Sequence, residues 1–236
     1  MSDRLQKVLS QWGVASRRGA EQMILEQRVR INGAIAQLGQ KADPDTDDIE
    51  VDGKRLKRRP QSVYLLMHKP FGVVSTCDDP QGRKTVLDLL SKSERSHQGI
   101  HPVGRLDLAS TGALLLTNDG EMTFRLTHPR HSLAKTYEVW VEGRPSAAVI
   151  HQWRQGVLLS GKQTRPAQVT CLRSEIDRAL LRVILKEGRN RQIRRVAEQL
   201  GHPVLSLHRT AIAKIKLGTL APGQYRPLTV KEIQSL

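Results

Sequence analysis

The sequence predicts an α+β protein in two parts, a small helix-and-hairpin module over residues 1–59 and a larger domain with a mixed, mainly antiparallel sheet over 63–236. Near the start, apolar residues recur twice at helical spacing and then give way to short alternating segments joined by Asn-Gly and Asp-Gly, which favour tight hairpins. The stretch at 57–62 is charged, polar and contains a proline, which is typical of a linker. Beyond it, strand patterns outnumber helix patterns without strict alternation, which favours α+β over a parallel α/β fold.

The small module is predicted to begin with two helices. The first carries an apolar stripe at the spacing of one helical face, and Gly13 should end it in the left-handed conformation. Ser16 can cap the second helix through its hydroxyl. Hairpins around Asn32-Gly33 and Asp52-Gly53 should follow. The stripe of the first helix consists of Leu5, Val8, Leu9 and Trp12, and the apolar side of the second consists of Ala20, Met23 and Ile24.

The larger domain is predicted to open with a buried strand, a turn at Lys69–Gly72 and a return strand. In a later strand, Tyr137 and Val139 share one buried face while polar residues occupy the other. The last helix begins with a capping box from Thr229 to Glu232. In chain order we expect strands at 63–67 and 73–76, a short helix at 85–90, a strand at 113–117, a helix at 121–127, a strand at 135–142, a helix from Pro145, strands at 157–159, 168–172 and 179–185, a helix that ends at Gly201, and strands at 204–207 and 214–217.

The charge of the chain indicates a polyanionic partner. Lysine and arginine number 38 against 23 aspartate and glutamate, which gives a net charge of +15. Such an excess attracts nucleic acid at long range, although a merely soluble basic protein or one that binds an anionic membrane surface would show it too. Residues 1–60 carry a net charge of +3 and the other 176 carry +12. The small module is therefore not expected to be the only surface that binds the polyanion.

Other classes of function are disfavoured by missing patterns. Cys77 and Cys171 stand alone and give neither a zinc pattern nor a disulfide framework, and the eight histidines lack ligand spacing. There is no glycine-rich phosphate loop, and the aromatic content of 3% argues against a sheet that reads bases by stacked rings. No apolar run is long enough for a membrane span and no signal sequence opens the chain, so we expect a cytoplasmic protein without a metal or a cofactor.

The loop from Gly104 to Gly112 is the first candidate for a functional site. Asp107 follows an arginine in this turn-forming run, and an apolar strand, residues 113–117, comes directly after it. Taken alone, a carboxylate in such a loop is most simply a solvated turn residue. The motifs on both sides of the loop change this interpretation.

Residues 3–50 resemble the S4 RNA-binding module. The resemblance is carried by the two helices, the hairpin-rich end and two motifs, Ser16–Arg18 and Arg28–Gly33. It implies that five side chains lie on or near an RNA-facing surface, whereas the alternative is an ordinary solvated face. Acidic residues cluster between 43 and 48, and this loop should point away from the RNA. The five RNA-facing residues would be Lys7, Arg17, Arg18, Arg28 and Asn32.

Four stretches of the larger domain, in this order and spacing, resemble the RsuA/RluB-type pseudouridine synthases, which also carry an N-terminal S4 module. One departure is Ala109, where relatives often have a polar residue, and it bears on substrate choice rather than on the chemistry. The stretches are Tyr64–Val73, His101–Asp107 with the strand that follows it, Lys135–Tyr137, and Glu187–Arg195.

The resemblance implies that the protein isomerises uridine to pseudouridine in RNA. In this reaction the bond from N1 to C1′ breaks, the base turns, and C5 bonds to C1′. Reactant and product have the same composition, so no redox cofactor, nucleotide or metal is required. Because the S4-bearing branch of the family acts on ribosomal RNA, we expect ribosomal RNA or a pre-ribosomal particle as the partner. The overall resemblance of the motifs favours large-subunit RNA over small-subunit RNA, and a monomer is the default for the oligomeric state.

The resemblance also implies roles for individual residues. Asp107 would be the catalytic carboxylate, either as a nucleophile or as the group that removes a sugar proton. Arg194 would hold it ionised in a pocket that excludes water, where burial disfavours the charged form. Tyr137 would pack on the target uracil and assist proton transfer at C5, after the base has left the RNA stack. The residues expected to bind the RNA around the flipped nucleotide are Arg105, Lys135, Arg189 and Arg191.

Each of these roles has a plainer alternative. Arg194 is otherwise one more arginine on a solvated helix face, Tyr137 an ordinary core tyrosine, and Arg105 a residue that supports the backbone. For the whole protein, the alternative is a non-enzymatic S4-domain RNA-binding or ribosome-assembly factor, which would have no need of Asp107. A glycosidase-like enzyme that releases the base would need a second carboxylate and a water, and the sequence shows no motif for such a partner.

Overall fold

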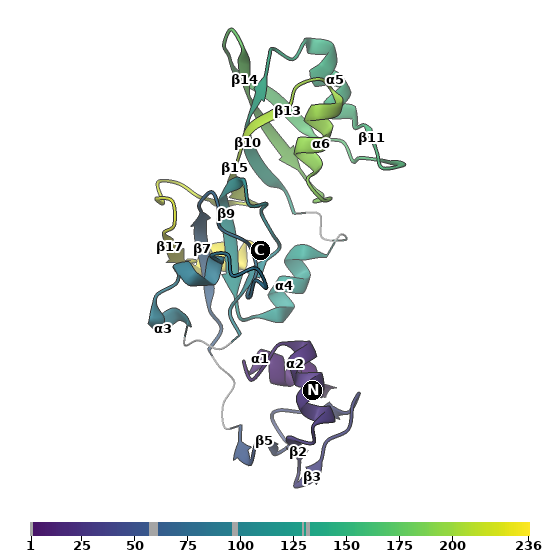
Figure 1. Cartoon of the computed structure of the whole chain (residues 1–236), viewed down its shortest axis with the longest axis vertical. Coiled ribbons are helices and arrows are strands. Elements are labelled where there is room, and N and C mark those ends of the chain that lie inside the picture. Colours follow the sequence, from purple (N-terminus) through teal and green to yellow (C-terminus); the bar gives the residue numbers. More distant parts are fainter. Residues whose placement is uncertain (1, 57–60, 96–98, 129, 131–132) are drawn as a thin grey trace. The chain divides into compact units, whose positions relative to one another are not determined.

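The structure is a computed structural model of the chain, and it describes residues 2–56, 61–95, 99–128, 130 and 133–236 (Figure 1). Residues 57–60, which form most of the predicted linker, lie outside the described residues. The chain divides into two compact units, one formed by residues 1–63, 90–101 and 117–120 and the other by residues 64–89, 102–116 and 121–236. The predicted boundary between residues 59 and 63 stays a prediction.

The N-terminal residues form the predicted helix-and-hairpin module. Gly13, at φ +72°, follows α1 (Leu5–Gln11), and Ser16 caps α2 (Arg17–Leu25) by accepting a hydrogen bond from the backbone N–H of Gly19 at 3.1 Å. Asn32 and Gly33, at φ +51° and +81°, turn β2 (Val29–Ile31) into β3 (Ala34–Ile35), as their sequence predicts. The helices and strands share one apolar core. The other strands are β1 (Asp3–Arg4), β4 (Lys41–Ala42), β5 (Ile49–Val51) and β6 (Lys54–Arg55), which give a sheet β3-β2-β5-β6 and a pair β1-β4.

The larger unit is built on a mixed, mainly antiparallel sheet of nine strands, as predicted. Its strands are β7 (Tyr64–Lys69), β8 (His101–Val103), β9 (Ser110–Thr117), β10 (Lys135–Glu142), β13 (Gln168–Ser174), β14 (Arg178–Leu185), β15 (Val204–Ile212), β16 (Ile215–Lys216) and β17 (Tyr225–Pro227). Their order is β13-β14-β10-β15-β9-β7-β17 (Figure 1). β16 pairs with β15, and β8 pairs with β9. β9 and β15 run parallel and pair over three residues, Ser110–Gly112 against Leu207–Arg209. The other elements of this unit are the hairpin β11 (Leu158–Leu159) and β12 (Lys162–Gln163), the 3₁₀ turn η1 (Val86–Leu89), and the helices α4 (Gly120–Thr127), α5 (Ala147–Gln155), α6 (Gln192–Gln199) and α7 (Val230–Gln234). The short helix α3 (Lys92–Arg95) belongs to the first unit.

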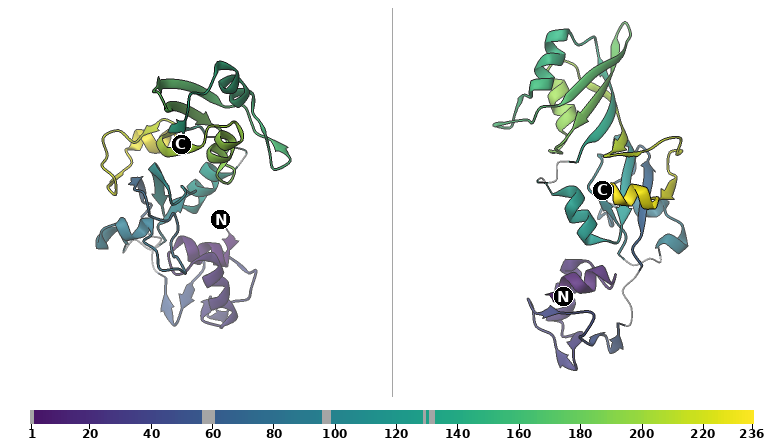
Figure 2. Two further views of the ribbon diagram at one scale, coloured as in Figure 1. Left: turned by 45° about the horizontal axis from the view of Figure 1, so that its top comes forward. Right: turned by 180° about the vertical axis from the view of Figure 1, so that it is seen from behind.

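Two hydrophobic cores pack against different strands of this sheet. In the first, α5 and α6 cover one face of β10, β13 and β14, and bury Trp153 and Ile193 against it (Figure 2). In the second, α4 packs on β7 and β9 through Met122 and Leu126, and the C-terminal helix α7, yellow in Figure 2, adds Ile233. Both cores include residues of β15. This strand and its neighbours β9 and β10 therefore form the centre of the unit, and the candidate site lies here.

The return strand predicted at 73–76 is wrong. Val74 makes one isolated bridge with Thr85, and the segment otherwise follows an irregular path. Lys69, predicted to be the first residue of a turn, is instead the last residue of β7 and is fully buried. The hydroxyl of Ser75 and the backbone N–H of Gly72 contact the Asp107 loop, which a local strand pattern does not reveal.

The strand predicted at 204–207 is too short, because β15 continues to Ile212. The sequence turns polar at His208 and Arg209, but both residues are paired with β10 on one side and β9 on the other. The two ladders keep these residues in the strand although the apolar alternation ends. The helix predicted from Pro145 begins two residues later, after the cap Ser146, and β17 was not predicted.

Gly112 lets β9 and β15 approach closely, and an added side chain should separate them. Its φ is +108°, and a Cβ atom there would lie 2.2 Å from the carbonyl oxygen of Arg209. Gly161, at φ +74°, has nothing within 4 Å of the same position, so Gly161→Ala is a matched control for backbone strain alone. We expect Gly161→Ala to lower the free energy of unfolding by about 1–2 kcal/mol and Gly112→Ala by about 3 kcal/mol or more. Urea unfolding measures both, and equal losses would contradict the close approach.

Candidate active site

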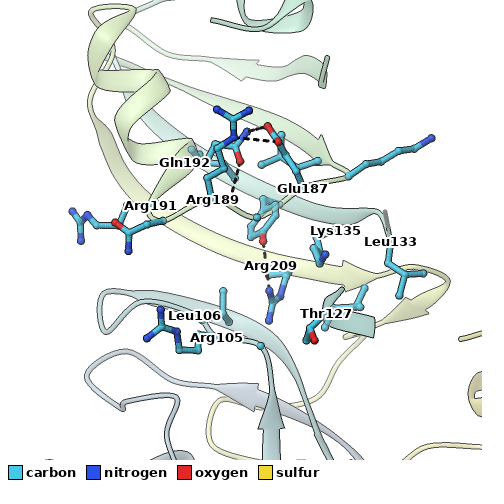
Figure 3. A pocket seen from close by; sticks show the side chains of 18 of the residues that line it. Arg105, Leu106, Thr127, Leu133, Lys135, Glu187, Arg189, Arg191, Gln192 and Arg209 are labelled. Atoms are coloured by element: carbon cyan, nitrogen blue, oxygen red, sulfur yellow. Dashed lines mark hydrogen bonds and ion pairs between the residues drawn. The ribbon is translucent and has the colours of Figure 1, made fainter. Parts of the chain in front are cut away.

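A pocket of about 770 Å³ opens in the larger unit where the Asp107 loop meets β10 and β15 (Figure 3). The structure brings together six of the seven residues that the sequence assigns to catalysis or substrate binding, and these six line this one pocket. The seventh, Arg194, contacts the Asp107 loop. The six lining residues are Arg105, Asp107, Lys135, Tyr137, Arg189 and Arg191.

The Asp107 loop is held by the segment that follows β7. Ser75 donates its hydroxyl to the carbonyl of Leu106 at 3.0 Å and accepts the N–H of Leu106 at 3.2 Å. The N–H of Gly72 donates to the carbonyl of Leu108 at 3.0 Å. Two segments that lie some thirty to forty residues apart in the sequence, the one around Lys69–Ser75 and the one around Asp107, are therefore hydrogen-bonded to each other. Gly72 of the first motif and Ser75, two residues beyond it, therefore hold the loop backbone on both sides of Asp107.

Lys69 supplies the third attachment of this loop. Its ammonium donates to the carbonyls of Pro70 at 2.9 Å, Ser110 at 2.8 Å and, more weakly, Leu108 at 3.4 Å. The side chain is fully buried, and this burial lowers the pKa of Lys69 to about 8, with Asp107 opposing the shift and Arg209 adding to it. A buried cation therefore lies beneath the candidate catalytic carboxylate.

Arg194 approaches Asp107 without a close ion pair. Its Nε lies 4.0 Å from Oδ2 of Asp107, and its Nη2 donates to the carbonyl of Ala109 at 2.8 Å and to the hydroxyl of Ser110 at 3.3 Å. Nε is buried and has no hydrogen-bond partner among the described residues. Burial first, and then Arg191, lowers the pKa of Arg194, while Asp107 opposes this. Arg194 is thus attached to the loop backbone, and the side chain at position 109 is not part of the contact.

The predicted water-free environment of Asp107 is not what the free protein shows. The Asp107 side chain keeps 33% of its surface exposed, against 14% for Arg194. The pocket is open, so the carboxylate faces solvent in the absence of RNA. A bound nucleotide would have to complete its enclosure.

Tyr137 and Arg209 form the wall of the pocket on β10 and β15. Tyr137 lies opposite Arg209 in the strand register, and Arg209 lies opposite Gly112 on its other side. The Arg209 side chain is 4% exposed, and its Nε donates to the carbonyl of Ala113 at 2.6 Å. Its Nη1 is 3.5 Å from the Tyr137 hydroxyl, and its guanidinium carbon is 5.9 Å from the centre of the tyrosine ring. Figure 3 shows this guanidinium inside the pocket.

The remaining predicted substrate-binding residues differ in how much they are already engaged. Arg189 is braced by Glu187 (3.3 Å from Nε) and by the carbonyl of Lys162 (2.8 Å from Nη1), so it ties the β11–β12 hairpin to the loop before α6 (Figure 3). Arg191, at φ +49°, and Arg105 are both exposed at the pocket, and Lys135 is half-buried there. Burial and the nearby Arg209 lower the pKa of Lys135. Arg105 and Arg191 are the more available groups for an RNA backbone.

Lys69 and Arg209 are the site residues that the sequence did not reveal. Both are charged side chains at positions where the strand pattern calls for a buried residue. Lys69 ends a run of apolar residues, and Arg209 shares the inward face of β15 with Leu207. That alternation would have identified Arg209 if the strand had been extended past residue 207.

In the N-terminal module, three of the predicted RNA-facing residues have partners within the module. Lys7 pairs with Asp3 at 2.8 Å, and Arg28 pairs with Asp52 at 2.8 Å, an interaction that raises the pKa of Arg28. Asn32 donates to Asp47 at 2.9 Å, so the acidic loop lies beside this residue and not away from it. The other two, Arg17 and Arg18, are exposed in the first turn of α2.

Two findings apply to the described part of the chain as a whole. None of its helices has the length and apolar content needed to cross a membrane. Within the same residues, His, Cys, Asp and Glu form no group of three or more that could hold a metal ion.

Comparison with known proteins decides the family. Residues 63–199 match the family model described as RNA pseudouridylate synthase, and residues 3–48 match that of the S4 domain. The chain belongs to the RNA pseudouridylate synthase family. It is an S4-bearing pseudouridine synthase of the RsuA/RluB type and hence an isomerase, which confirms the predicted family, fold and class of enzyme.

Relatives match this pseudouridine synthase over nearly its whole length. The ribosomal large subunit pseudouridine synthase B of Bacillus subtilis is 40% identical over 237 residues, covering 99% of this chain and 95% of the relative. An uncharacterised RNA pseudouridine synthase of Mycobacterium tuberculosis, Rv1711, is 41% identical over 234 residues, covering 99% and 92%. A solved structure described as a crystal structure of pseudouridylate synthase superimposes with a TM-score of 0.72 at 31% identity, covering 98% of both chains. The fold and the order of the two domains are therefore those of the family.

Proposed function

We propose that this enzyme isomerises one uridine of large-subunit ribosomal RNA, using Asp107 as its single catalytic carboxylate after the target base has left the RNA stack. The observation that carries the proposal is the placement of Asp107 and Tyr137 in one open pocket, with Arg194 hydrogen-bonded to the loop that carries Asp107. The choice of large-subunit RNA rests on the names of relatives such as the Bacillus subtilis enzyme. The net charge of +15 suits a polyanionic substrate.

The chemistry needs one carboxylate because nothing is hydrolysed. N1 leaves C1′ with the bonding electrons, C5 then attacks C1′, the proton on C5 is lost, and N1 gains a proton. Asp107 balances the positive character that develops at C1′, as carboxylates do when a glycosidic bond breaks. The Tyr137 ring packs on the uracil and directs C5 towards the sugar. Extrusion of the base costs a few kcal/mol, which contacts with the RNA backbone must offset.

The RNA contacts follow from which cations are free. Arg105 and Arg191 bind phosphates beside the pocket, Lys135 binds close to the base, and Arg189 acts mainly by bracing the hairpin β11–β12. In the S4 domain, the exposed pair Arg17 and Arg18 at the start of α2 provides the principal phosphate contact. Lys7, Arg28 and Asn32 support this surface through their partners within the domain. The enzyme acts as a monomer and without a cofactor in the cytoplasm, where ribosomal RNA is assembled into ribosomal subunits.

Tritium release tests the proposed function directly. Ribosomal RNA transcripts tritiated at C5 of uracil should release tritium to water when incubated with the full chain, and large-subunit RNA should do so in preference to small-subunit RNA. A non-enzymatic RNA-binding factor would bind without release, and a glycosidase would free the base. Mapping of pseudouridines in cells that lack this protein then identifies the target. Loss of a pseudouridine from small-subunit RNA alone would overturn the choice of substrate.

Replacement of Arg194 should slow the reaction more than it weakens the fold. Because its Nε has no hydrogen-bond partner among the described residues and lies 4.0 Å from Asp107, we expect the pair to tighten when a nucleotide covers it. Arg194→Ala should lower the single-turnover rate by about 100-fold, and Arg194→Lys, which keeps the charge but not the fork geometry, by about 10-fold. Because the carboxylate stays partly exposed, the thermal midpoint should change little. Arg182→Ala, at an exposed position of β14, is the control, and an unchanged rate in Arg194→Ala would contradict the pairing.

A further inference from the structure

Arg209 is a buried arginine whose hydrogen bonds are incomplete. It is 4% exposed in the middle of the sheet, and no carboxylate pairs with it among the described residues. Nε donates to the carbonyl of Ala113 at 2.6 Å, and the one contact of Nη1 with the described residues is a long one, 3.5 Å to the Tyr137 hydroxyl. Nη2 is buried and has no partner among the described residues. An arginine buried in this way is costly, since an unpaired charge and an unmade hydrogen bond both oppose folding.

Lys69 shows what a purely structural cation looks like in the same unit. It is equally buried, but all three of its N–H groups point to carbonyl oxygens, at 2.8 Å, 2.9 Å and 3.4 Å. Arg209, in contrast, lines the pocket, and its Nη2 is without a partner among the described residues (Figure 3). A residue needed only to join β9 to β15 could satisfy Ala113 with a single donor. The unused donors therefore point to an acceptor that is absent from the free protein.

The reaction supplies such an acceptor. As the bond from C1′ to N1 breaks, the electron pair stays with the base, and the negative charge spreads onto its two carbonyl oxygens. If Asp107 instead added to C6 of the ring, the negative charge would be carried by one of these two oxygens, O4. Either route requires a positive donor beside the base, in a place where water does not compete. Such preorganised donors are among the strongest contributions to catalysis.

We propose that Arg209 is a further catalytic residue, which donates its free N–H groups to a carbonyl oxygen of the uracil and stabilises the negative charge of the departing base. The contact also keeps the detached base in the pocket while it turns from N1 to C5. Tyr137 lies beside Arg209 in the strand register, so one residue packs on the ring while the other binds its edge. The inference rests on the proposed function, because it assigns a role within the same reaction.

The test compares Arg209→Met, which removes the charge at similar length, with the parent enzyme and with the exposed control Arg182→Met. Single-turnover tritium release from large-subunit RNA should fall by about 100- to 1,000-fold in Arg209→Met, whereas its affinity for the RNA should stay within about threefold because the residue does not contact phosphates. A folded Arg209→Met variant with a rate within threefold of the parent would overturn the proposal. Arg182→Met should behave as the parent.

A leaving-group comparison separates this role from a structural one. RNA that contains 5-fluorouridine carries a base whose anion is more stable, so it needs less help to depart. The loss caused by Arg209→Met, followed as the disappearance of the unrearranged nucleoside from nuclease digests, should be at least about tenfold smaller with this RNA. A structural defect would slow both substrates equally, and equal losses would overturn the proposal. If Arg209→Met does not fold, the same two RNA substrates are compared with Arg209→Lys.

The controls keep this inference apart from the proposed function. If the parent enzyme released no tritium from any ribosomal RNA, the proposed function itself would be wrong. If the parent were active, Asp107→Asn inactive and Arg209→Met fully active, only the role of Arg209 would be wrong.

Discussion

Asp107→Asn is expected to abolish pseudouridine formation while leaving RNA affinity nearly unchanged. The amide has the same shape as the carboxylate, but it cannot balance the charge at C1′ or act as a nucleophile. We expect the single-turnover rate of tritium release to fall by at least about 10⁴-fold, the scale seen when a residue at the centre of a reaction is removed. The loop should keep its conformation, because its attachments to Lys69, Gly72 and Ser75 run through the backbone of residues 106–110.

Two controls give this result its meaning. Asp177→Asn makes the same chemical change at an exposed turn and should leave the rate unchanged. Filter binding of the RNA should give a Kd within about threefold of the parent for Asp107→Asn, since the charge removed opposes the phosphate backbone and does not attract it. Undiminished release by Asp107→Asn would mean that the pocket does not perform the reaction.

Lys69→Met should show the second largest effect, and it should act on both the fold and the rate. The substitution leaves the carbonyls of Pro70 and Ser110 without their donor, at about 1–3 kcal/mol for each buried unpaired group, although it also removes a buried charge. We expect a net loss of about 2–3 kcal/mol in the free energy of unfolding. Because the same contacts set the position of the Asp107 loop, single-turnover tritium release should fall by about 100-fold.

The pH dependence of stability identifies the Lys69 contribution. Burial lowers the pKa of Lys69 from its ordinary value of 10.5 to about 8. Between these two values the unfolded chain binds a proton that the folded chain does not, so this group makes the parent protein more stable as the pH rises from about 8 towards 10.5. Urea unfolding at several pH values should show this rise in the parent but not in Lys69→Met. Subtracting the free energy of unfolding of Lys69→Met from that of the parent at each pH removes the contributions of the other groups that titrate in the same range.

Lys84→Met is the control for both Lys69 measurements. It makes the same exchange at an exposed position of the neighbouring segment. The control should match the parent in stability, rate and pH dependence. If Lys69→Met kept the full slope between pH 8 and 10.5, another group would have to account for it.

Local sequence determined much of the fold in advance. The bounds of β10 agree with the alternation of apolar and polar residues from Lys135 to Glu142, and the hairpin at Asn32-Gly33 follows from the left-handed preference of both residues. The capping box at Thr229 is present as predicted, because it needs only neighbours within one turn. Such features depend on residues close in sequence, and so they can be recognised without the rest of the chain.

The features that the sequence did not reveal all depend on distant partners. Lys69 is buried because carbonyls of residues 108 and 110, about forty positions later, receive its N–H groups. Arg209 continues its strand because β9 and β10 pair with it, and no local pattern shows this. The motifs placed Asp107, Tyr137 and Arg194 in one site, but the distance of 4.0 Å and the partial exposure of Asp107 follow from packing alone.

The short parallel contact of β9 with β15 also bears on when the enzyme becomes functional during its synthesis. Thr111 and His208, which hydrogen-bond across this contact, are 97 positions apart in the chain, so the contact closes a long loop and is expected to form late in folding. During translation, Asp107 and Tyr137 are synthesised and emerge from the ribosome well before Arg209. Because both cores also include residues of β15, a nascent chain can complete neither core, and cannot rearrange a nucleotide, until β15 has emerged from the ribosome.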